Sequence, residues 1–486
     1  MDMKKLIIII LTASLVFIGL QNRAFAKVVS KNEALQAANN WITLIINKKG
    51  DWGGSDTAVV EDIRELKRMG KTIGYFSEVS PRGFIIVSLR KELAPIKAYS
   101  SENDLDPDVN KGMANLIKEK MAQIINEIEQ QLGPLDTIRS RDLRNILEIN
   151  YSSAWDELIG SRGEKTPEVF QSDVGLLNYQ EGDILLTSSW HQSAPYNDQT
   201  PAGATCTHTL VGCVATAGAQ IMRHWNWPPY GVGVTYNDTY DWPNMLDRAT
   251  TASSAAERAA VAELNHEVGV AVGMNYGCDA SGAYTYDMEG VYENQYRYST
   301  AAVRRNRNDY TATGWFDRLK LQFNANRPVQ YRLVGHSIVG DGWQEIGATP
   351  TRQYHMNYGW DDGHNTWWTL DALYLGGIDE EYIIENIYPA QATGSWISGT
   401  YAKQSFPYRY FDRDATGYSA TFESGQYLQF LPDITVTNTS ATGGSFRFEG
   451  SGTLNTRLFT RGDTSTGVRI YNGAIKVNQN GSIKFN

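Results

Sequence analysis

The pattern of apolar and polar positions changes several times along this chain. Near the N-terminus a capping-box signature begins at Ser30, and apolar residues then recur at helical spacing. Two apolar, β-rich runs over 72–79 and 83–88 are separated by a proline-containing turn, which is typical of a hairpin. A later apolar stripe over 113–132 predicts a long helix that ends at Gly-Pro. We therefore predict a small α+β domain over 27–133.

The periodicity then fades and returns. Residues 134–180 are polar and irregular in pattern, which predicts a linker that a protease can reach. Residues 181–391 regain periodicity, with a helix expected at 255–270 and a strand at 329–339. From 392 to 486, short alternating runs stand among Gly, Ser, Thr and Asn, which predicts an all-β module without catalytic groups.

The first 26 residues are typical of a secretory signal peptide. Lys4 and Lys5 precede an apolar run from Leu6 to Leu20, and small residues at Ala24 and Ala26 form a cleavage pattern. The run is short for a membrane span, and no other stretch reaches the ~18 continuous apolar residues of a membrane helix. We therefore predict an exported protein without a membrane span, either extracellular or associated with the cell envelope.

Composition narrows the classes of function. The chain has 486 residues, which predicts several domains, and 42% of them are hydrophobic. Its net charge of −10 argues against a nucleic-acid partner, and no glycine-rich phosphate-binding loop opens a helix. The histidines and cysteines lack the spacings of common metal sites, so we expect no metal and no cofactor.

One cysteine is placed as a nucleophile would be. Cys213 follows Gly212 at the predicted start of a helix, where unpaired backbone N–H groups and the helix dipole favour a thiolate. The alternative is a small hydrophobe packed under that helix. An odd count of three cysteines in an exported protein leaves at least one thiol unpaired. A bridge between Cys206 and Cys278 would leave Cys213 free, although the sequence does not fix that pairing.

A cysteine nucleophile needs a base and an oxyanion hole. His336 ends an apolar strand between small residues; a hydrogen-bonded core histidine is the alternative. His355 is a second candidate base, and its neighbour Asn357 could orient an imidazole. The side-chain amide of Gln192 could pair with the Cys213 N–H to bind an oxyanion, or belong to an ordinary loop residue. The order Gln, Cys, His, Asn is that of a papain-like site.

Several blocks between about 180 and 390 occur in one order. They are Trp190-x-Gln192-x-x-Pro195-Tyr-Asn197, Gly212-Cys213 with the helix to Met222, Trp227-Pro228, Asn275-Tyr-Gly277, Gly335-His336, His355-x-Asn357-x-Gly-Trp360 and Leu370-Asp-Ala-Leu373. Together these blocks resemble the streptopain family, which are secreted bacterial cysteine endopeptidases of papain-like fold. The segments Gly74-Tyr-Phe-Ser77 and Gly83-Phe-Ile-Ile-Val-Ser88 resemble the inhibitory propeptide of that family.

The resemblance implies an inhibitory propeptide (27–133) and a papain-like catalytic domain (181–391), with a linker between them that is cut on maturation (134–180). The signal peptide (1–26) and the all-β module (392–486) are predicted from the residues alone, and that module lies outside the resemblance. The fold class expected for the whole chain is α+β. It implies a zymogen that hydrolyses protein or peptide substrates through a thioester acyl-enzyme, with its own propeptide as intramolecular inhibitor. The roles it implies are the nucleophile Cys213, the general base and acid His336, the oxyanion-hole residue Gln192, the orienting Asn357, and the substrate contacts Gly335 and Ser281.

Two departures from the family pattern lie near the site. Tyr358 stands where the family has a tryptophan, which predicts a smaller or tilted aromatic cover over His336. Asp361-Asp362-Gly363 replaces a glycine-rich segment and adds negative charge, which would raise the pKa of a nearby imidazolium.

Two other functions compete with a protease. One is an envelope-associated adhesin with a degenerate protease domain, for which the tail and Arg461-Gly462-Asp463 could be quoted. The other is a thiol acyltransferase or amidase on a similar fold. For the module at 392–486 we expect binding to a cell-envelope or extracellular polymer, with a stabilising or sorting role as the alternative.

Overall fold

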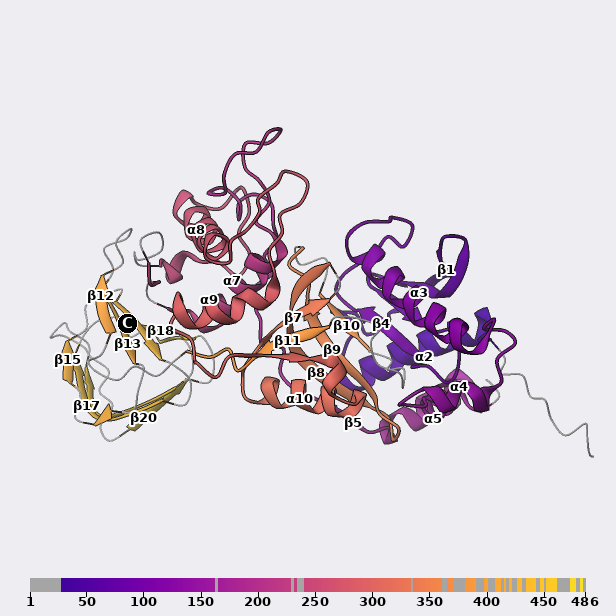
Figure 1. The fold of residues 1–486 in the computed structure, drawn as a ribbon. Helices are drawn as coiled ribbons and strands as arrows, with labels where there is room; N and C mark the ends of the chain where they lie inside the picture. The colour runs from indigo at the N-terminus through magenta and orange to yellow at the C-terminus, as the bar shows by residue number, and fades with distance from the viewer. Residues whose placement is uncertain are drawn as a thin grey trace, which may run out of the picture. The chain divides into compact units, whose positions relative to one another are not determined.

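The structure is a computed structural model, shown in Figure 1. It describes residues 28–389, except 162–164, 229–230, 234–239, 334, 361–364 and 370–380, and then strand segments between 397 and 483. The predicted signal peptide therefore lies outside the described residues. The chain divides into two compact units: an N-terminal unit of 1–180 with 345–353 and 367–378, and a second unit of 181–344, 354–366 and 379–486.

The N-terminal unit opens with the predicted capped helix, α2 (Lys31–Lys49). The Ser30 hydroxyl accepts the Glu33 N–H at 3.3 Å, and the Glu33 carboxylate accepts the Ser30 N–H at 2.9 Å. This reciprocal pair satisfies N–H groups that have no partner inside the helix. The helix ends at Gly50, whose φ of 96° suits a residue without a Cβ. The capping box read from the sequence is thus confirmed.

An antiparallel sheet forms the core of the N-terminal unit. It orders β1 (Val59–Arg68), β2 (Lys71–Ser80), β3 (Phe84–Val87) and β4 (Ile96–Ser100), and the predicted hairpin joins β2 to β3. Every residue of β3 is buried, so this strand lies in the middle of the core. The long predicted helix is α3 (Gly112–Leu132), which packs against β1 and β2. The small α+β domain predicted here has the expected elements.

The segment after α3 differs from its prediction. It holds three short helices, α4 (Ser140–Ile146), α5 (Ser152–Ile159) and α6 (Pro167–Asp173), followed by η1 (Val174–Leu176). Trp155 in α5 is fully buried, and its indole N–H donates to the Leu93 carbonyl at 2.9 Å. The irregular backbone expected over 134–180 is therefore not found in its described residues, whereas a linker that is cut on maturation stays a prediction. Helices of seven or eight residues give too little periodicity to recognise and depend on tertiary burial for their stability.

The second unit contains the helices α7 (Cys213–Trp225), α8 (Ala255–Ala271), α9 (Met288–Asn294) and α10 (Ala312–Asn324). The first three lie together in Figure 1. Its sheet runs in the order β9 (Thr351–Asn357), β8 (His336–Ile346), β7 (Val329–Leu333), β11 (Tyr382–Glu385) and β6 (Val303–Asn306). The helix predicted at 255–270 is thus present. The single strand predicted at 329–339 is instead a hairpin of β7 and β8, and His336 begins the second strand instead of ending the first.

Short elements complete the two units: η2 (Trp242–Asn244), η3 (Thr285–Asp287), η4 (Arg307–Asp309), β5 (Tyr179–Glu181) and β10 (Thr366–Trp368). Among the residues that the structure describes, no helix combines the length and apolarity needed to cross a bilayer.

Beyond residue 396 every described segment is a strand. The strands are β12 (Ile397–Thr400), β13 (Pro407–Phe411), β14 (Ala415–Thr416), β15 (Ser419–Thr421), β16 (Gln426–Phe430), β17 (Ile434–Thr442), β18 (Phe446–Glu449), β19 (Gly452–Thr460), β20 (Gly473–Val477) and β21 (Gly481–Ile483). They pair into two five-stranded sheets. The tripeptide at 461–463 lies outside the described residues, and a single all-β module over 392–486 stays a prediction.

Candidate active site

Cys213 is the first residue of α7, as the sequence predicts. Gly212 precedes it with a φ of 89°, and a Cβ there would lie 2.6 Å from the sulfur of Met274. Only glycine therefore fits this turn. The turn aims the half-buried thiol of Cys213 from the N-terminus of a helix whose other residues are almost all buried.

The hairpin of β7 and β8 brings His336 to the same place. His336 begins β8 opposite Leu333, and the next pair along the hairpin joins Ser337 to Arg332. The backbone N–H of Ser337 donates a hydrogen bond to the Cys213 sulfur. Cys213 and the His336 strand are thus adjacent in space although they are far apart in the sequence.

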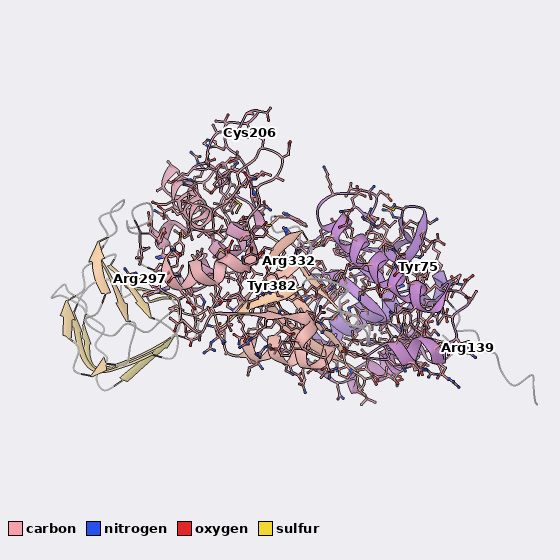
Figure 2. The ribbon with its side chains drawn as sticks, in the orientation of Figure 1. Tyr75, Arg139, Cys206, Arg297, Arg332 and Tyr382 are labelled. Carbon is pink, nitrogen blue, oxygen red and sulfur yellow. A yellow bond between two sulfur atoms is a disulfide. The ribbon has the colours of Figure 1, made fainter. Side chains whose placement is uncertain are left out.

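A groove of about 670 Å³ holds these groups. Its wall includes Arg332 and Tyr382, which face each other across β7 and β11 and are labelled in Figure 2. The Arg332 guanidinium lies 5.9 Å from the Tyr382 ring centre. The predicted site residues that line the same groove are Cys213, Ser281, Gly335 and His336.

The His336 ring is held by a carbonyl and by an indole. Its Nε2 lies 2.9 Å from the Tyr358 carbonyl oxygen, which can only accept, so Nε2 carries the proton and neutral Nδ1 keeps a lone pair. Trp360 stacks on the imidazole with ring centres 4.2 Å apart and planes 22° apart. The Tyr358 ring is farther away, at 6.4 Å.

This packing corrects the expectation of a reduced aromatic cover. Trp360 covers the imidazole two residues after the substituted position, because Gly359 with a φ of 66° turns the chain between them. The segment 361–363, which we expected to add negative charge, lies outside the described residues.

The side chain of Asn357 makes no hydrogen bond to the His336 ring, which it was expected to orient. Its side chain donates to the Ser188 carbonyl at 2.8 Å, accepts the Gly359 N–H at 3.0 Å and bonds to Gln220. A direct hydrogen bond from Asn357 to His336 is therefore not present, because the carbonyl of the following residue occupies that place. The sequence missed this carbonyl and the Ser337 N–H, since main-chain groups leave no side-chain signal. Trp360 did stand in a recognised block.

Gln192 and Ser281 border the cysteine. The Gln192 carbonyl accepts the Val211 N–H at 3.0 Å, which fixes the Gln192 loop beside the turn into α7. The Ser281 hydroxyl donates to the Leu210 carbonyl at 2.7 Å and accepts the Gly277 N–H at 3.0 Å. Ser281 therefore braces the segment that leads to Cys213.

The disulfide that the sequence could not fix joins Cys206 to Cys278. Cys213 is the free thiol. The bridge lies next to the loops bordering the groove, because Leu210 N–H also donates to the Gly277 carbonyl at 3.1 Å.

The other histidine candidate belongs to a different cluster. Nδ1 of His355 lies 2.7 Å from a carboxylate oxygen of Asp341, which is itself fully buried. His355 does not line the groove of Cys213. Across the described part of the chain, no group of three or more His, Cys, Asp or Glu side chains is placed to hold a metal ion.

Burial acts on the charges of both site residues. It lowers the pKa of His336 to about 4, against the hydrogen bond to the Tyr358 carbonyl. Burial also raises the pKa of the Cys213 thiol, against the hydrogen bond from the Ser337 N–H. Both shifts favour the neutral form near pH 7. Burial thus opposes the thiolate that the helix start favours at Cys213.

Comparisons with known proteins agree with this geometry. Residues 190–368 match the Peptidase C10 family, and residues 26–124 match the Spi protease inhibitor. Streptopain from Streptococcus pyogenes is 27% identical over 404 residues, which cover 77% of this chain and 94% of streptopain. The thiol protease/hemagglutinin PrtT of Porphyromonas gingivalis is 27% identical over 209 residues, covering 39% of this chain and 24% of PrtT.

A solved structure supports the fold. The prointerpain A fragment from Prevotella intermedia aligns with a TM-score of 0.52 and 24% identity, covering 68% of this chain and 99% of the fragment. Cys213 and His336 both lie in the region that matches the Peptidase C10 family, and the matched inhibitor domain precedes them in the chain. The chain thus resembles the peptidase C10 proteins over residues 190–368, and it is a cysteine endopeptidase made with an inhibitor propeptide domain.

Proposed function

We propose that the chain hydrolyses peptide bonds through a Cys213–His336 dyad and a thioester acyl-enzyme. The observation that carries this proposal is that Cys213 and His336 line the same groove, where the N–H of Ser337, the neighbour of His336, bonds to the Cys213 sulfur. The thiolate of Cys213 attacks the substrate carbonyl, and His336 protonates the leaving amine. Water activated by the same imidazole then releases the acyl group.

The oxyanion that forms during this attack needs hydrogen-bond donors. We assign them to the side-chain amide of Gln192 and the backbone N–H of Cys213. The contact of the Gln192 carbonyl with Val211 N–H supports this assignment, because it keeps Gln192 beside the α7 start. Asn357 serves the dyad through the main chain that follows it, and Gly335 and Ser281 border the substrate.

The dyad has to ionise before it can attack. Burial raises the pKa of Cys213 and lowers that of His336. Hydration of the groove would reverse both shifts and so favours the thiolate–imidazolium pair. We propose that this ion pair forms once the groove gains water in the mature enzyme.

Maturation requires a cut between the inhibitor domain and the enzyme. The helices α4 to α6 belong to the N-terminal unit, which argues against a cut among them. Residues 175–184 are exposed or half-buried and follow the last of these helices. We place the cut there, at the end of the segment where the sequence predicts it.

Two further parts of this proposal concern the ends of the chain. The lysine-led apolar segment at 1–26 supports export and a secreted enzyme. The strands between 397 and 483 support an accessory all-β module over 392–486, to which we assign binding of a cell-envelope or extracellular polymer.

One experiment tests the catalytic and maturation proposals together. Purified full-length chain is incubated under reducing conditions, with and without a thiol-directed inhibitor, and the new N-termini are sequenced. We expect a cut within 175–184 that the inhibitor blocks, and a Cys213→Ser chain that stays at full length. Normal turnover of a protein substrate by that variant would refute the dyad, and a first cut within 134–174 would refute the proposed maturation site.

A further inference from the structure

A fully buried glutamine lies under the candidate active site. Gln220 is on α7, seven residues after Cys213, so the two share one face of the helix. In the sequence, Gln220 stood out only as part of the block that follows Cys213. Because a buried amide is stable only when its polar atoms have partners, the partners of Gln220 show what it holds.

The carbonyl oxygen of Gln220 binds the loop that carries Gln192. It accepts the Trp190 N–H at 3.0 Å and the Ser188 hydroxyl at 3.1 Å. Both contacts lie in the stretch leading into Gln192, so this oxygen fixes the approach of the proposed oxyanion-hole residue to the helix.

The same amide binds the segment that holds His336. The Gln220 NH₂ group donates to the Asn357 side-chain oxygen at 3.1 Å, and the Gln220 oxygen accepts the Asn357 side-chain NH₂ at 3.2 Å. The Asn357 oxygen also accepts the Gly359 N–H at 3.0 Å, which closes the turn around Tyr358. The Tyr358 carbonyl in this turn is the hydrogen-bond acceptor of the His336 ring.

We propose that Gln220 is a positioning residue that fixes three parts of the site relative to one another. These parts are the helix of Cys213, the loop of Gln192 and the carbonyl that orients His336. A single side chain provides this link because its carbonyl oxygen binds both segments and its NH₂ group adds a second bond to Asn357. The inference rests on the proposed Cys213–His336 dyad. Small displacements of such groups cost rate rather than binding, because the transition state needs alignment that the bound substrate does not.

The test compares two substitutions at this position. Gln220→Met keeps the length of the side chain but removes every hydrogen bond. Gln220→Glu keeps oxygens that can accept from Trp190, Ser188 and the Asn357 side-chain NH₂, but removes the donor to the Asn357 oxygen. The matched control is Gln322→Met, since Gln322 is also a buried helical glutamine and its amide bridges to Asn386, away from the groove.

Two measurements separate positioning from folding. Each full-length variant is trimmed by tagged wild-type enzyme, which is then removed, and kcat and KM are measured on a peptide after active-site titration. Exchange of the His336 Nε2 proton with water is followed by NMR in a Cys213→Ser background. Thermal unfolding of every variant is recorded alongside.

We expect Gln220→Met to lower kcat by 10- to 100-fold, with KM changed less than threefold and faster exchange of the His336 proton. Gln220→Glu should fall between wild type and Gln220→Met, while Gln322→Met keeps kcat within twofold at a similar loss of Tm. If Gln220→Met does not fold, the kcat and proton exchange of Gln220→Glu decide. A wild-type kcat, a loss no greater than that of Gln322→Met, or unchanged proton exchange would overturn the proposal. An active Cys213→Ser enzyme would instead refute the dyad itself.

Discussion

The imidazole of His336 is bound through the main-chain carbonyl of Tyr358, with Nε2 and the carbonyl oxygen 2.9 Å apart. A carbonyl acceptor fixes the tautomer of the ring, because only a protonated Nε2 can donate to it. This leaves Nδ1 as the atom that can take a proton. The main chain of residue 358 thus takes the orienting role that the sequence assigned to the Asn357 side chain.

Trp360 should control the protonation of His336. In the Trp360→Ala variant, loss of the stacked indole admits water, so the pKa of His336 should rise from about 4 toward the ordinary value of about 6.5. NMR titration of the imidazole in a Cys213→Ser background measures this shift. Tyr358→Phe is the control and should leave the pKa of His336 unchanged, because it keeps the main-chain carbonyl. An unchanged titration in Trp360→Ala would contradict the assigned cover.

The thiol of Cys213 should react slowly at neutral pH in the full-length chain. Burial raises its pKa and lowers that of His336, so the thiolate fraction should grow about tenfold per pH unit from pH 7 to 9. Timed alkylation of the freshly purified chain, without reductant, gives this profile, since Cys206 and Cys278 are bridged. The urea-unfolded chain serves as reference and should level off near its ordinary pKa. A plateau already reached at pH 6 would show that the ion pair exists before maturation.

Removing the disulfide should weaken both stability and the groove. The bridge spans 72 residues, for which the chain-entropy account gives about 4 kcal/mol of stabilisation. We expect the double variant Cys206→Ser, Cys278→Ser to lose about 2–5 kcal/mol, measured by urea unfolding. KM should rise because the Ser281 loop is tied to the same region, whereas alkylation of Cys213 should persist. An unchanged unfolding midpoint would refute a stabilising role for the bridge.

The helices after α3 should be integral to the N-terminal unit. Trp155→Ala deletes a fully buried indole, which typically costs about 3–5 kcal/mol, together with its hydrogen bond to Leu93. Limited proteolysis of the full-length chain should then cut within 134–174 faster than in wild type. The exposed Val169→Ala, outside the proposed cut, is the control and should change little. Equal proteolysis of Trp155→Ala and wild type would restore the linker interpretation of this segment.

The pattern of apolar and polar positions was enough to predict the long helices. The α2 helix was recognisable from Ser30 and Glu33, whose capping box depends only on residues three apart. Cys213 was recognisable from the glycine before it and the helix after it. The three short helices around Trp155 were not, because each is shorter than the window over which periodicity is visible, and their burial partners are distant in the chain.

For the candidate site, the sequence by itself determined which side chains are present and the order in which they occur. Only the tertiary structure decided what holds them: a Tyr358 carbonyl instead of the Asn357 amide, Trp360 as the cover, and Gln220 at the centre of a buried network. The pairing of Cys206 with Cys278 was also decided there. The physical reason is that hydrogen bonds, ring stacking and desolvation depend on distances in space. A sequence specifies these distances only for residues within a few turns of one another.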